Sequence, residues 1–299
     1  MSRLKRRLNV LAMATAVTAL GAMLSGSPAS AAVPAAGVAA TGPATLSLTA
    51  ESNFDSRVYK SVRIFCPAGM QVIGGGYNLS GAEGAVVLDD FIPSATDLLV
   101  GAGEIVGPGE SPDGTTASWK IVATVVCATT LPGYSVQPAS SGIARIRTQR
   151  AEASCPPGRA LIGGGASLSN GFGQVSIRNL TIGTSSVTAE AITDLDGYTD
   201  SWSVTAYAIC AASPLAGWHV VPQATPNDPT VPKVVTAFCP PGQIAVGSGW
   251  FTDGFTWDRL VTRSVVNGDP DPGATAAGVQ VAPDRAWVLR ADAVCIDRT

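Results

Sequence analysis

Two short signatures, each present three times, decide the fold. The first reads CPAGMQVIGGG at 66–76, CPPGRALIGGG at 155–165 and CPPGQIAVGSG at 239–249. The second reads WKIVATVVC at 119–127, WSVTAYAIC at 202–210 and WVLRADAVC at 287–295. Signatures that recur in a fixed order indicate a repeat architecture. The chain therefore divides into three units, at 44–132, 133–216 and 217–299.

The second signature has the period of a β-strand. Alternate residues of a strand share a face, so the face that runs from each Trp to each Cys is apolar. The opposite face carries polar residues such as Lys120, Thr205 and Arg290. This pattern favours an antiparallel strand with one face on a core. Frequent Gly and Pro with abundant Val, Thr and Ser also favour strands and turns over helices.

Each unit reads as about four strands, and no unit is expected to bury its apolar face alone. We predict an all-β fold in which three repeated antiparallel β units form a threefold β-prism, with three sheets packed round one core. The alternative is three small β-sandwich-like modules in tandem.

The six cysteines indicate disulfides, because an even number in an exported chain is typical of them. Pairing within units predicts Cys66–Cys127, Cys155–Cys210 and Cys239–Cys295. Pairing between units would instead join Cys127 to Cys155 and Cys210 to Cys239, and would leave Cys66 to meet Cys295. We favour the first scheme because the repeat is the natural folding unit.

The N-terminal segment has the layout of a secretory signal peptide. Basic residues at 3–7 precede an uncharged apolar run at 10–24 and small residues at 29–31. The run is shorter than the roughly 20 residues that a membrane span needs. We therefore predict a signal peptide at 1–31, a flexible leader at 32–43, and a secreted, extracellular mature protein without a membrane span.

Charge and motifs exclude several classes of function. The formal net charge is −3, and removal of the basic N-terminal segment makes it more negative, so nucleic acid is not expected as a partner. The glycines at 74–76 and 163–165 lack the helix and the Gly-Lys-Ser/Thr of a phosphate-binding loop. They indicate close strand packing or a bulge, and we expect no cofactor.

The order of Cys-Pro-x-Gly, glycine triplet, Trp and Cys resembles that of secreted repeat proteins common in actinobacteria, a largely uncharacterised group. The resemblance covers nearly all of the chain after residue 31. The third unit departs from it at Ser248 and Ile296. The chain also resembles, more weakly, the vitelline membrane outer layer protein, in its threefold repetition, disulfides and Cys-Pro-x-Gly turns. That resemblance implies a β-prism, and neither resemblance implies a reaction.

No catalytic residue stands out. His219 is the only histidine, and no Gly-x-Ser-x-Gly motif supplies a nucleophile for it. The remaining chemistry lies in loop carboxylates such as Asp89 and Asp90. A weak calcium candidate is formed by Asp194, Asp196 and Asp200. Turn formation explains these last three as well.

The tryptophans fall into two groups. Trp119, Trp202 and Trp287 recur in place and are interpreted as core. A second group is concentrated in the third unit and could stack on sugars or hold a protein partner. These ligand-binding candidates are Trp218, Trp250, Phe255 and Trp257. The alternative is that they complete the end of the core.

Together these observations predict a secreted non-enzymatic binding or structural protein. Its expected partners are a glycan or other cell-envelope material, or another secreted protein. The alternative is an extracellular hydrolase that uses the loop carboxylates.

Overall fold

A computed structural model describes most of the chain after residue 42. The described ranges are 43–106, 114–171, 173–194, 196–213, 215–254, 257–281 and 285–298. The predicted signal peptide and all but the last residue of the predicted leader lie outside them, as does Phe255. Among the described residues the fold is all β, with 18 strands. A search of the same residues finds no helix long and apolar enough to cross a membrane.

Each unit has six described strands rather than about four. The first unit holds β1 (Thr45–Glu51), β2 (Tyr59–Phe65), β3 (Met70–Ser80), β4 (Val86–Pro93), β5 (Asp97–Glu104) and β6 (Lys120–Thr129). The second holds β7 (Ser135–Ser140), β8 (Thr148–Ser154), β9 (Arg159–Ser169), β10 (Val175–Ile182), β11 (Ser186–Thr193) and β12 (Ser203–Ala212). The third holds β13 (His219–Ala224), β14 (Lys233–Phe238), β15 (Gln243–Thr252), β16 (Arg259–Asn267), β17 (Gly273–Gln280) and β18 (Leu289–Asp297).

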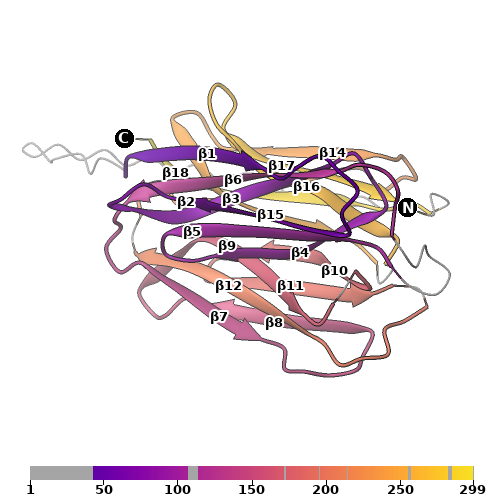
Figure 1. The fold of residues 1–299 in the computed structure, drawn as a ribbon. Helices are drawn as coiled ribbons and strands as arrows, with labels where there is room; N and C mark the ends of the chain where they lie inside the picture. Colours follow the sequence, from indigo (N-terminus) through magenta and orange to yellow (C-terminus); the bar gives the residue numbers. More distant parts are fainter. Residues whose placement is uncertain are drawn as a thin grey trace, which may run out of the picture. The chain divides into compact units, whose positions relative to one another are not determined.

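The units exchange strands to build three antiparallel sheets. The strand orders are β1-β6-β3-β16-β17-β14, β13-β18-β15-β10-β11-β8 and β2-β5-β4-β9-β12-β7. Every sheet takes three strands from one unit and three from another, so each unit shares a sheet with both others. In Figure 1 the indigo strands of the first unit accordingly lie beside the yellow strands of the third. The prediction of three repeated units round one core is confirmed, and shared sheets replace the tandem modules of the alternative.

Three glycine-rich strands, β3, β9 and β15, meet in the centre. Each has a bulge just before its first glycine, and the backbone carbonyl of the bulged residue faces the first glycine of another unit. The facing pairs are Gly74 with Val246, Gly163 with Ile73, and Gly247 with Ile162. A Cβ on any of these glycines would collide with the carbonyl oxygen. Close packing and a bulge therefore explain the glycine triplets, as predicted.

The strands of the second signature form the inner wall of the core. Trp119, Trp202 and Trp287 are fully buried, as are the alternate residues that follow them to the cysteines. The disulfides are Cys66–Cys127, Cys155–Cys210 and Cys239–Cys295, which is the pairing predicted within units.

Candidate functional site

The aromatic candidates of the third unit do not form a site around Trp250. Trp250 is fully buried, and its ring contacts those of Tyr77 and Phe91, with centroids 5.4 and 6.2 Å away. It lies 11 residues after the first cysteine of its unit, the place that Tyr77 holds in the first unit. The prediction that Trp250 stacks on a ligand is therefore corrected, because its indole belongs to the central core.

The other two described candidates are half-buried and have different neighbours. The indole Nε1 of Trp218 donates a hydrogen bond to the backbone oxygen of Leu161. Trp257 packs against a small cluster of Val87, Ile105 and Leu260. These contacts agree with the alternative interpretation, in which the aromatics complete the core.

The calcium candidate is also corrected. Asp194 is buried, and its Oδ1 accepts a hydrogen bond from the backbone nitrogen of Gly197 at 3.1 Å. Asp196 and Asp200 are exposed. Within the described ranges, no group of three or more His, Cys, Asp or Glu side chains could hold a metal ion. Asp194 instead closes a turn, as its neighbouring Gly197 favours.

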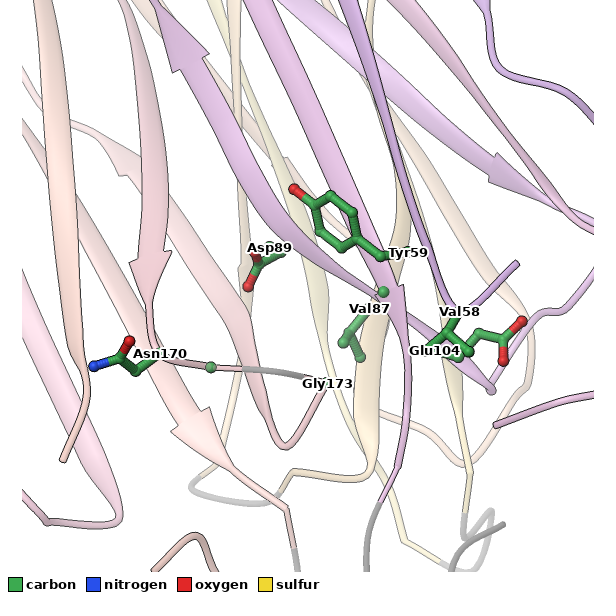
Figure 2. Close-up of a pocket in the computed structure, with 9 residues that line it drawn as sticks. Val58, Tyr59, Val87, Asp89, Glu104, Asn170 and Gly173 are labelled. Atoms are coloured by element: carbon green, nitrogen blue, oxygen red, sulfur yellow. The ribbon is translucent and has the colours of Figure 1, made fainter. Parts of the chain in front are cut away.

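A pocket of about 380 Å³ lies where the first unit meets the second. Its residues come from β2 and the residue before it, from β4 and β5, and from the segment after β9, and Figure 2 shows how the labelled ones lie. The lining consists of Val58 and Tyr59, Val87 and Asp89, Gly103 and Glu104, and Asn170, Gly171 and Gly173. Asn170 has a left-handed backbone with φ of 64°, which asparagine tolerates better than most residues. The walls are mainly apolar, as is usual for pockets that bind small ligands.

Asp89 is the unusual group in this pocket. It is the extra residue of a bulge in β4, where the register with β5 shifts between Leu88 and Asp90. Bulges re-aim side chains and often occur next to functional sites. Its Oδ1 is buried and has no hydrogen-bond partner among the described residues. Burial, and then the charge of Asp90, raise the pKa of Asp89 to about 7.

Asp90 is held by a tyrosine at the rim. The hydroxyl of Tyr59 donates a hydrogen bond to Asp90 Oδ2 at 2.9 Å. This contact depends on Gly101, since a Cβ there would collide with the Tyr59 hydroxyl. Burial raises the pKa of Asp90, and the bond from Tyr59 opposes that rise. Tyr59 is itself 49% exposed, so its ring remains open to a ligand.

Glu104 also lines the pocket, but both of its carboxyl oxygens accept hydrogen bonds from other residues. Its Oε1 accepts a hydrogen bond from Trp119 Nε1, and its Oε2 accepts one from the backbone nitrogen of Thr115, both at 2.8 Å. In Figure 2 its carboxyl group points away from Asp89. Asp89 is therefore the carboxyl group of this pocket that can receive a hydrogen bond from a ligand.

The sequence contained a signal for this pocket that residue-type reasoning missed. Asp89, Arg178 and Thr262 all lie 23 residues after the first cysteine of their units, and all three are bulge residues. The first unit thus has an acid, Asp89, at the position where the second unit has the cation of Arg178 and the third has the hydroxyl of Thr262. Aligning the variable segments on the cysteines would have singled out Asp89 from the other loop carboxylates.

Comparison with known proteins adds no assignment. No family model matches this chain, and no curated protein matches it. The two resemblances seen in the sequence therefore stay predictions.

Proposed function

We propose that the chain is a secreted, non-enzymatic binding protein whose ligand enters the pocket beside Asp89. One observation carries this proposal: Asp89, whose Oδ1 is buried without a hydrogen-bond partner among the described residues, lines a pocket large enough for a sugar-sized molecule. A buried polar atom without a partner is costly. A ligand that donates a hydrogen bond to it would remove that cost.

Secretion is part of the same proposal. The signal-peptide pattern at 1–31 and the three disulfides both favour an oxidising, extracellular location. Cell-envelope or carbohydrate material is therefore the expected source of the ligand. The half-exposed ring of Tyr59 offers the stacking surface that the buried Trp250 does not.

The hydrolase alternative fits the pocket less well. A glycosidase needs two carboxyl groups that face the scissile bond from opposite sides. In this pocket Glu104 is bonded to Trp119 and Thr115, and Asp90 is bonded to Tyr59. Asp89 by itself can bind and orient a ligand, but it lacks the second carboxyl group of that mechanism.

The test uses a variant that fills the pocket without disturbing the fold. A Cβ on Gly103 would meet its nearest atoms, in Tyr59 and Val58, at an ordinary 3.7 Å. The second unit has the buried Ile192 at the equivalent strand position. We therefore choose Gly103→Ile, with Gly268→Ile as matched control, because Gly268 is exposed and has no atom near its Cβ position.

The assay measures retention of purified mature protein on bacterial cell walls and on insoluble polysaccharides. We expect retention of the wild type and of Gly268→Ile, and at least a tenfold loss for Gly103→Ile, which is about 1.4 kcal/mol. Equal retention of all three proteins, or retention of none, would overturn the proposal. Release of soluble sugar by the wild type would overturn its non-enzymatic part and favour the hydrolase.

A further inference from the structure

The ionisable groups in the described lining of the pocket are all acids, and Asp90, which is bonded to Tyr59, is another. From β4 come Asp89 and Asp90, from β5 comes Glu104, and from β2 comes Tyr59. The described lining contains no lysine and no arginine. The pocket is therefore electronegative whenever its carboxyl groups are ionised, and it attracts positive charge.

The carboxyl group of Asp89 lacks a hydrogen-bond donor. Asp89 Oδ1 is buried without a partner, and Gly171 brings only backbone near it, since a Cβ there would lie 3.3 Å from this oxygen. An ionised carboxylate in such surroundings is best compensated by a cationic donor, because charge-assisted hydrogen bonds are roughly twice as strong as neutral ones.

In the second unit, the charged side chain at the same backbone position is paired with another side chain of the protein. Its bulge residue is Arg178, and the guanidinium forms a buried ion pair with Glu190 on the neighbouring strand. In the first unit the bulge residue is Asp89, and Gly101 stands at the position of Glu190. The first unit therefore has an acid where the second has the cation, and its partner position carries no charge to pair with that acid.

The rest of the lining selects the body of the ligand. Val58, Val87 and the ring of Tyr59 form an apolar wall, which suits a ring or an alkyl stem. Resting on the function proposed above, we infer that the ligand carries an ammonium group on such a body, with the ammonium placed against the Asp89 carboxylate. A sugar with a free amino group meets both requirements.

The test compares two probes of the same shape, benzylammonium and benzyl alcohol. Binding to the purified mature protein is followed by calorimetry and by chemical-shift changes of the backbone amides near the pocket. Asp89→Asn removes the charge, and Asp196→Asn, at an exposed aspartate, is the matched control. Gly103→Ile reports whether any binding is in the pocket.

We expect benzylammonium to bind at least tenfold more tightly than benzyl alcohol at pH 8, and Asp89→Asn to remove that difference. Asp196→Asn should behave like the wild type. Because Asp89 gains a proton below a pKa of about 7, the affinity for benzylammonium should fall by about tenfold for each pH unit below 7. The affinity for benzyl alcohol should not fall in this way.

Equal binding of both probes, or an unchanged preference in Asp89→Asn, would overturn the inference about the cation. If such binding is still abolished by Gly103→Ile, the pocket remains a binding site and only the inference about the cation fails. Binding of benzylammonium that Gly103→Ile leaves unchanged would overturn the inference by placing the cation elsewhere. The proposed function is decided separately by retention on cell walls.

Discussion

The β4–β5 pair of the first unit and the β10–β11 pair of the second have the same backbone and opposite side-chain chemistry. Both carry a bulge at the same place, at Asp89 and at Arg178. In the second unit Arg178 is bound by Glu190, and the buried Ile192 fills the adjacent space. In the first unit glycines replace both of these partners.

The scaffold and the site are therefore encoded by different residues. The bulges, the glycine triplets and the Trp strands recur and build the prism. Three positions, at 89, 101 and 103, decide whether the space beside β4 is closed or open. The third unit differs again at these positions, with Thr262 at the bulge and Val279 in place of Gly103. Function can therefore diverge in one unit without a change of fold.

The largest predicted effect is on stability as a function of pH. The folded protein keeps the Asp89 proton up to a pKa of about 7, whereas the unfolded chain loses it near the ordinary 3.8. Between these values the folded state binds more protons, so the free energy of unfolding decreases as pH rises. The slope is at most about 1.4 kcal/mol per pH unit, or about 4 kcal/mol over the window.

Denaturant titrations at intervals from pH 4 to 8 would measure this slope. Asp89→Asn should lose it and should be more stable than the wild type above pH 7. Parallel pH profiles for the wild type and Asp89→Asn would show that Asp89 is not buried unpaired.

The next largest effect concerns the ion pair between Arg178 and Glu190 in the second unit. The Arg178 side chain is only 3% exposed and its partner Glu190 19%, so Arg178→Ala leaves a largely buried carboxylate without its ion pair. We expect a loss of about 3 kcal/mol in the free energy of unfolding, measured in urea. The double variant Arg178→Met with Glu190→Leu should recover most of that loss. A double variant as unstable as the single one would contradict the assigned role of the pair.

A smaller effect is expected from the hydrogen bond between Tyr59 and Asp90 at the rim of the pocket. Tyr59→Phe removes the hydrogen bond to Asp90 and should lower the free energy of unfolding by about 1 kcal/mol. Thermal unfolding of the variant beside the wild type at the same pH would measure it. An unchanged midpoint would show that water replaces the hydroxyl at no cost.

The smallest effect is the stability change in Gly103→Ile. Glycine inside a strand costs conformational entropy, and isoleucine favours strands, so we expect a gain of about 0.5 kcal/mol. Equilibrium unfolding of the variant beside the wild type would measure it. A clear destabilisation would mean that the open space at Gly103 is needed for folding rather than for binding.

The sequence allowed the scaffold to be predicted further than the site. The inward face of each Trp strand and the three disulfides followed from residue type and spacing. The exchange of strands between units could not be predicted, because local alternation shows which face is buried but not which edge strand lies beside it. For Trp250 the sequence left both stacking on a ligand and completion of the core open, and the structure decides for the core because Trp250 takes the buried place that Tyr77 holds in the first unit.

The most direct test of the account is the ionisation of Asp89 in the free protein, followed by NMR of its ¹³C-labelled carboxyl group. The Asp89→Asn variant assigns the signal. We predict an apparent pKa near 7 for Asp89 in the free protein, and a shift of the pKa below that value when benzylammonium is bound. A pKa near 3.8, the ordinary value for aspartate, would mean that the carboxyl group is already solvated or paired, which would contradict the open, unneutralised site described above.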